Sequence, residues 1–209
     1  SNEIQSLLAQ ADYMLANGKG ADALLLYERA SELDPNNPDA LMMRAAILGE
    51  SGRLEEAIEC CRKTVDLDPG DGDAHVMLGR LLLMQGRPSE AEACLEYVVK
   101  LDPEYGEAWS TLSTVYLAQG RFAEAEQSSR QSIRLLPDTA EAYLNLGNAL
   151  LSQGRRDEAL ASSAKAVELE PNNAMIWCSF GLIHERAESW ENARGAYKNA
   201  TRLASFLSN

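Results

Sequence analysis

The chain has 209 residues, of which 45% are hydrophobic and 24% charged, and its formal net charge is −13. Phosphate groups repel such an acidic chain, so its composition disfavours nucleic acids and anionic membrane surfaces and favours basic or neutral partners. No apolar run approaches the roughly 20 residues of a membrane-spanning helix, and membrane insertion is therefore not expected.

Four residue types recur every 34 residues in one register. Glycine recurs at 18, 52, 86, 120 and 154, and proline at 35, 69, 103, 137 and 171. Alanine recurs at 23, 57, 91, 125, 159 and 193, and leucine at 33, 67, 101, 135, 169 and 203. The length alone suggests one or two globular domains, but these ladders indicate a repeat protein whose core is a continuous ribbon.

Each period is predicted to form two helices joined by a tight turn. The glycine supplies the left-handed residue that ends the first helix, and the proline stops the second. Six consecutive units follow, at residues 4–37, 38–71, 72–105, 106–139, 140–173 and 174–207. No linker or strand pattern interrupts them, so we expect one array over residues 4–207.

The residues at the unit junctions fit helix starts. Pro38 and Pro88 occupy expected first helical positions, where the missing N–H costs little. Side chains that cap helix N-termini stand just before four of the first helices, as Asn37, Asp71, Thr139 and Asn173.

The fifth unit shows the pattern most clearly. Tyr143, Leu146 and Leu150 form one helical stripe, and Gly147 and Ala159 are small where two antiparallel helices must approach closely. The sixth unit departs, with Glu188 in place of the turn glycine and Ser205 in place of the proline. Its outer apolar residues have no following repeat to cover them, so we expect a capping helix or an end-to-end contact over Tyr197, Leu203 and Phe206.

The 34-residue period and these residue types resemble the tetratricopeptide repeat (TPR), a helix-turn-helix unit that stacks into a solenoid. The resemblance covers residues 4 to 207. It implies an all-α fold, a right-handed α-solenoid of six repeats, and the function of a non-catalytic protein–protein interaction scaffold.

No group of residues in the sequence indicates catalysis, a metal or a cofactor. His75 replaces an aromatic core residue, His184 lies on an inward stripe, and three repeats separate them by roughly 30 Å at about 10 Å per stacked pair. The cysteines 60, 61, 94 and 178 lack the paired spacing of a zinc site, and we expect unpaired structural thiols. Free thiols and the lack of a visible signal peptide favour a reducing, cytoplasmic compartment.

The first-helix face that points away from the core stripe is the predicted peptide-binding surface. In tetratricopeptide-like solenoids this face of the first helices lines a concave groove. Its apolar members in repeats 1 to 3 are Leu8, Met42, Met43, Val76, Met77, Leu83 and Met84. In repeats 4 and 5 it is small and polar, and Asn145 and Asn148 are the candidate contacts there.

The charges on this face predict the character of the ligand. An acidic row, Asp39, Asp73, Glu107 and Glu141, favours an apolar or amphipathic peptide with basic flanks, and Arg80 could orient one acidic group on it. The lysine-based clamp that holds carboxyl termini in one subclass of the family is disfavoured, because no lysine stands at the fifth position of any repeat.

A second charged row follows the turns, as Lys19, Arg53, Arg87, Arg121 and Arg155. Such cations stabilise helix ends, or they form a basic strip for an acidic partner. Two further functions remain open, namely a recognition arm of a larger enzyme such as a transferase, and a scaffold that self-associates through its terminal repeats.

Overall fold

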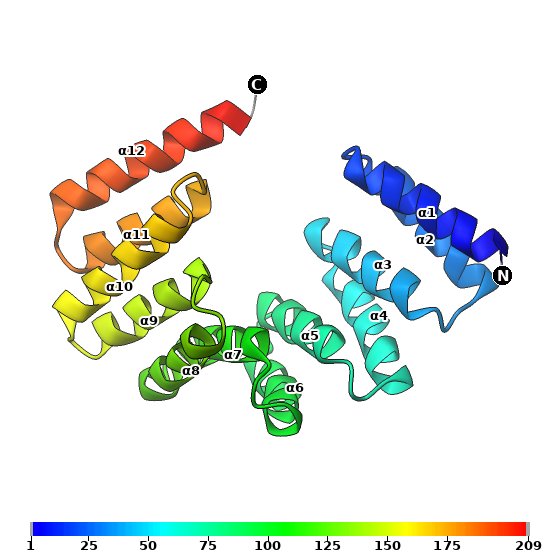
Figure 1. The fold of residues 1–209 in the computed structure, drawn as a ribbon, viewed down its shortest axis with the longest axis horizontal. Helices are drawn as coiled ribbons and strands as arrows, with labels where there is room; N and C mark the ends of the chain where they lie inside the picture. Colours follow the sequence, from blue (N-terminus) through cyan, green and yellow to red (C-terminus); the bar gives the residue numbers. More distant parts are fainter. Residues whose placement is uncertain (1, 208–209) are drawn as a thin grey trace. The chain divides into compact units, whose positions relative to one another are not determined.

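The computed structural model describes residues 2–207, which form twelve α-helices and no strand (Figure 1). The helices are α1 (Asn2–Ala16), α2 (Gly20–Leu33), α3 (Pro38–Glu50), α4 (Leu54–Leu67), α5 (Gly72–Met84), α6 (Pro88–Leu101), α7 (Gly106–Ala118), α8 (Phe122–Leu135), α9 (Ala140–Ser152), α10 (Arg156–Leu169), α11 (Ala174–Arg186) and α12 (Trp190–Leu207). The all-α prediction is confirmed, and each 34-residue period holds one helix pair.

The helices group into two compact units, one ending at Leu101 and one beginning at Asp102. In the first unit, α5 packs against both α3 and α4 of the preceding hairpin. In the second, α9 packs against α7 and α8, and α11 packs against α9 and α10. The first helix of an inner repeat is therefore covered on several sides. In the fifth repeat, for example, eight residues of α9 are buried, whereas only three residues of α10 are buried.

Left-handed residues close the turns inside the hairpins. Gly154 has φ 79°, and the N–H of Arg155 then donates to the carbonyl of Leu150 at 2.9 Å, which ends α9. Glu188 adopts φ 56° at the equivalent place in the sixth repeat, followed by the same bond from Ser189 to His184 at 2.8 Å. The sixth turn thus keeps the geometry of the other five without their glycine, and a residue with a Cβ is strained in this conformation.

Small residues bring the two helices of a hairpin together, as predicted. A Cβ on Gly147 would lie 3.1 Å from the carbonyl oxygen of Ala159 and 3.3 Å from Ile183. The recurring alanines of the second helices are 0% exposed in repeats 1 to 5. At these positions a larger side chain has no free volume to occupy.

Helix starts follow the predicted caps with one exception. The side chains of Asn37, Asp71 and Asn173 each accept a hydrogen bond from a backbone N–H in the first helical turn, at 3.0, 2.9 and 2.9 Å. Thr139 makes no such bond, so the prediction of a side-chain cap is wrong there. Its backbone carbonyl instead accepts from the N–H of Ala142 at 3.2 Å.

A ring nitrogen at the fourth repeat position ties three first helices to the loops before them. Trp109, Trp177 and His75 bond the carbonyl oxygen of the proline six residues earlier at 2.9, 2.7 and 3.1 Å. For His75 this requires the tautomer with the proton on Nε2. His75 is 6% exposed, which confirms that it takes the place of an aromatic core residue.

The last hairpin covers part of its own apolar surface. The ring of Tyr197 lies over Gly181, and its hydroxyl donates to Glu185 at 2.6 Å, which raises the pKa of Tyr197 to about 12. Leu203 is half-buried, whereas Trp190 is 62% exposed. The side chain of Phe206 lies outside the described residues, and a covering contact at this end stays a prediction.

Replacing Ala91 by leucine should lower the free energy of unfolding by about 1–3 kcal/mol, because Ala91 is 0% exposed and the added carbons overpack the hairpin. Thermal or urea unfolding measures the effect. The matched control is Ala93→Leu, the same substitution at an exposed position of the same helix, which should change stability little. An unchanged midpoint for Ala91→Leu would contradict the close helix contact.

Replacing Glu188 by glycine should stabilise the chain by about 0.5–1 kcal/mol, because glycine adopts positive φ without the strain that a Cβ imposes. Part of the relief is lost to the greater freedom of glycine in the unfolded chain. Asp138→Gly, at a loop position outside the positive-φ residues, serves as the control and should not stabilise. A lower melting temperature for Glu188→Gly would refute the strain.

Candidate functional site

Three of the predicted binding residues line one hollow between α1 and α3. Its volume is about 480 Å³. Leu8 on α1 and Met42 and Met43 on α3 form its apolar wall, together with Ala9. All three predicted residues are half-buried, so each offers apolar surface to a ligand while staying anchored in the hairpins.

Two carboxylates and a buried phenol complete the hollow, and sequence reasoning missed two of these three groups. Asp12 and Asp39 stand at its wall, and Tyr27 reaches it from α2. Tyr27 is 1% exposed, and its hydroxyl donates to the carboxylate of Asp12. Burial and this bond raise the pKa of Tyr27, so it remains a donor that holds Asp12 in place. The missed signal was an acid on the first-helix face, three residues after Ala9.

The α5 candidates do not line this hollow. Val76 is 7% exposed and packs in the interior, because α5 lies against both helices of the preceding hairpin. Met77 and Leu83 are half-buried, whereas Arg80 and Met84 are exposed. The apolar lining is predicted to run continuously through repeats 1 to 3. The hollow is lined by residues of repeats 1 and 2 alone, and the exposed α5 residues Arg80 and Met84 lie outside it.

The two asparagine candidates are engaged within the second unit. Asn145 is 7% exposed, and its side-chain amide donates to the hydroxyl of Thr114 at 2.9 Å. Asn148 donates to the carbonyl of Leu144 and accepts from Arg186 at 3.1 Å each. The expectation that the fifth and sixth repeat positions face outward is wrong for Asn145 and Leu144, since the neighbouring first helices cover them.

Intrachain ion pairs engage the four arginines of the row that follows the turns. Arg53 and Arg155 each donate from two nitrogens to the glutamate three residues later, at 2.6–2.7 Å. Arg87 makes the same fork to Glu90, and Arg121 bonds Glu124. This geometry favours the role of stabilising helix ends over that of a basic docking strip.

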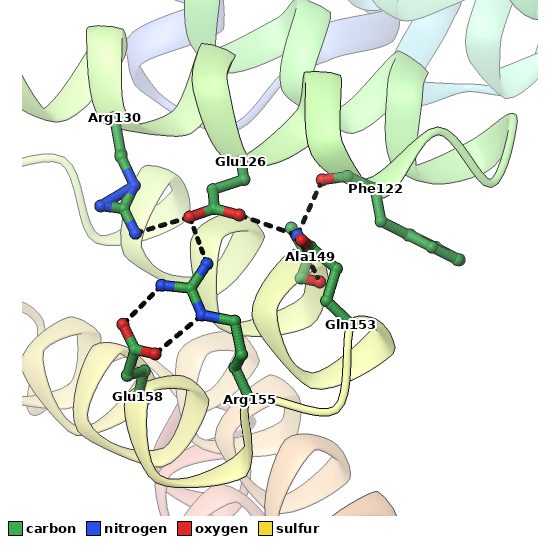
Figure 2. A network of polar contacts seen from close by, with 7 residues as sticks. All are labelled: Phe122, Glu126, Arg130, Ala149, Gln153, Arg155 and Glu158. Carbon is green, nitrogen blue, oxygen red and sulfur yellow. Dashed lines mark hydrogen bonds and ion pairs between the residues drawn. The ribbon is translucent and has the colours of Figure 1, made fainter.

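Glu126 on α8 is the centre of a polar network that spans two repeats (Figure 2). Its carboxylate accepts from Arg130 at 2.6 Å, from Arg155 at 2.7 Å and from the amide of Gln153 at 2.8 Å. Burial alone would raise the pKa of Glu126, but the hydrogen bonds from Gln153 and Arg155 and the charges of both arginines outweigh it and lower the pKa. The network joins the fourth repeat to the fifth.

His184 and Cys61 are titratable groups that lie in the core. Both ring nitrogens of His184 are buried without a hydrogen-bond partner, and burial lowers its pKa. All four cysteines are free, and burial raises the pKa of Cys61 to about 12, which suppresses the reactive thiolate. Among residues 2–207, no group of three His, Cys, Asp or Glu side chains could hold a metal ion.

Comparison with protein-family models gives two matches. The first model, described as the middle TPR-like domain of cilia and flagella-associated protein 70, matches residues 6–136. The second model, described as the tetratricopeptide repeat, matches residues 110–174 and 144–207. A search of curated proteins gave no match.

Solved structures agree with the family models. The crystal structure of MamA protein is 27% identical, with 83% of this chain and 94% of that chain covered and a TM-score of 0.68. The thermophilic TPR protein TTC0263 of Thermus thermophilus is also 27% identical, with 86% and 98% covered and a TM-score of 0.72. A tetratricopeptide repeat protein from Parabacteroides merdae is 20% identical and shares the fold, with 96% and 78% covered and a TM-score of 0.82.

Helical hairpins in a 34-residue register, closed by left-handed turns and small contact residues, define a helical-repeat protein with the fold of interaction scaffolds. The chain belongs to the tetratricopeptide-repeat family. Over the described residues, none of the helices combines the length and the apolar character that crossing a bilayer requires.

Replacing Glu126 by glutamine should lower the free energy of unfolding by about 1–2 kcal/mol at pH 7, because a charge-assisted network loses its anion. The folded-state pKa of Glu126 is lowered, so its stabilisation is complete above the usual carboxyl pKa of 4.5 and is lost as pH falls through the folded value. The difference between wild type and variant should therefore shrink below pH 4.5, as denaturant unfolding at pH 7 and pH 3 would show.

Glu168→Gln is the control for this experiment. Glu168 pairs with Lys165 at 3.1 Å, but its side chain is 66% exposed, and solvent screens the pair. Its loss should be hardly measurable at either pH. Equal effects of the two substitutions at pH 7 would contradict the central place of Glu126.

Proposed function

We propose that this chain is a protein-interaction scaffold without catalytic activity of its own, and that the hollow between α1 and α3 binds an amphipathic peptide segment with basic flanks. The hollow with its methionine wall and its two carboxylates is the observation that carries the proposal. The segment inserts an apolar side chain against Leu8, Met42 and Met43. Its lysine or arginine side chains lie against Asp12 and Asp39.

The shape and chemistry of the hollow support this class of ligand. Half-buried methionines adapt their shape to different apolar partners, because the side chain is unbranched and polarisable. The volume of the hollow, about 480 Å³, lies within the range of ligand pockets, which is roughly 300–1,000 Å³. The bond from Tyr27 holds the Asp12 carboxylate before binding, which reduces the ordering that a ligand must impose.

The second-unit asparagines are a weaker part of the predicted surface. Asn148 lies on the same first-helix face but already bonds Arg186, so a ligand must replace an existing contact. The same holds for Asn145, whose amide bonds Thr114. We therefore propose Leu8, Met42 and Met43 as the primary contacts and the α5 residues Met77, Arg80 and Met84 as secondary ones.

Met42→Glu should weaken binding of a fluorescent 20-residue amphipathic helix with lysine flanks by at least tenfold in an anisotropy titration. The added carboxylate places an unpaired charge in the apolar wall. Wild-type binding should also weaken between 50 and 300 mM salt, because salt screens the attraction between the flanks and the carboxylates. The same peptide with glutamate flanks should bind more weakly.

Leu25→Glu is the matched control, because Leu25 is a 64% exposed apolar residue of the same unit outside the hollow. It should leave the affinity unchanged, and both variants should keep the wild-type helical circular dichroism. Equal binding by Met42→Glu and wild type, or no preference for lysine flanks, would overturn the proposed site.

A further inference from the structure

A second, smaller cavity lies where α2, α3 and α4 meet, and none of its lining residues lines the hollow between α1 and α3. Its volume is about 200 Å³. Leu41 and Cys60 form an apolar part of the wall and are 3% and 6% exposed. Such a volume admits a small group on a short stem but no drug-sized ligand, which needs roughly 300 Å³ or more.

The cavity contains an arginine at a position that later repeats fill with apolar side chains. Arg44 occupies the seventh position of the second repeat, where repeats 3 to 6 have Leu78, Leu112, Leu146 and Phe180. The Nε atom of Arg44 is shielded from solvent and has no hydrogen-bond partner among the described residues. A buried donor of a charged group that lacks an acceptor is destabilising, so the Arg44 guanidinium is the group at this cavity that gains most from an anionic partner.

The acids at the cavity do not supply that partner. Glu56 accepts both of its close bonds from Arg53, at 2.7 and 2.6 Å, and the bond from Arg53 lowers the pKa of Glu56. Glu59 is exposed at the rim. Lys63, also at the wall, adds a second cation beside Arg44. The cavity lining thus combines two cations and two acids with an apolar part of the wall.

We infer that Arg44 binds a carboxylate group in this cavity. A carboxylate has two coplanar oxygens that match the planar fork of a guanidinium, and a short aliphatic stem fits against Leu41 and Cys60. Glu56 and Glu59 repel any anion at this cavity, but they repel a doubly charged phosphate about twice as strongly as a carboxylate, which favours the singly charged group. The carboxylate belongs either to a small free acid or to a side chain or C-terminus of a partner protein.

The test is a ¹⁵N NMR titration of the intact chain with sodium propionate, against sodium chloride at the same ionic strength. In wild type, the Arg44 Nε–H signal and the backbone amide signals of Cys60 and Lys63 should shift saturably with propionate only. Arg44→Leu introduces the residue type of repeats 3 to 5 and should fold, as its melting temperature checks. Its Cys60 and Lys63 signals should lose the saturable shift or require at least tenfold more propionate.

A second arm uses a tetrapeptide with a free C-terminal carboxylate and the same peptide as its amide. Saturation by the free-acid peptide but not by propionate assigns the group to a partner protein, and saturation by propionate alone assigns a small acid. Shifts that are linear, or equal in wild type and Arg44→Leu, overturn the inference.

Two control variants separate this site from other effects. Arg29→Gln removes an exposed arginine paired with Glu32 in the same unit and should leave the titration unchanged. Met42→Glu should also leave the propionate titration unchanged. A failed proposal for the peptide hollow can therefore be told apart from a failed proposal for this cavity. Loss of the propionate response in Arg29→Gln would also overturn the assignment to Arg44.

Discussion

The structure depends on the close approach of two helices within each repeat. At Gly147 the helices of the fifth repeat approach so closely that a Cβ would lie 3.1 Å from a backbone oxygen of the second helix, which is tighter than ordinary van der Waals contact. Fully buried alanines make the corresponding contact from the second helices. Because this approach is possible only when both positions are small, it sets the register in which the glycine turns and the stop prolines recur. Glu188 shows that the turn can persist without its glycine, whereas the small contact residues persist in every repeat up to Gly181 and Ala193.

Ion pairs offset the repulsion among carboxylates that a chain with a net charge of −13 must overcome to stay folded. Arginines at the start of second helices form ion pairs with glutamates one turn later. Glu126 pairs with two arginines from different repeats, Arg130 and Arg155. These cations relieve repulsion among carboxylates, and Arg155 also bridges two neighbouring hairpins. Arg62 similarly joins α4 to α6 through Glu90 at 3.0 Å. The carboxylates at the peptide hollow are differently placed, since Asp12 is held by the neutral hydroxyl of Tyr27.

The two candidate sites use opposite chemistry on different surfaces of one unit. The hollow between α1 and α3 combines methionines with carboxylates, which suits a basic amphipathic segment. The cavity among α2, α3 and α4 combines a shielded arginine with apolar carbons, which suits a carboxylate. The cavity arises where Arg44 replaces the apolar residue that repeats 3 to 6 have at this position, and such departures are expected at functional positions.

The sequence by itself determined the repeat, the helix pairs, the turn positions and the small contact residues, because these follow from local backbone preferences and a fixed period. It also singled out Leu8, Met42 and Met43, which share one hollow. Only the tertiary structure decided that Val76 and Asn145 are buried, because neighbouring hairpins cover faces that a single helical wheel leaves open. Only the tertiary structure joined Tyr27 to Asp12 and surrounded Arg44 with three helices, since these contacts depend on side-chain reach between separate helices and not on spacing along one.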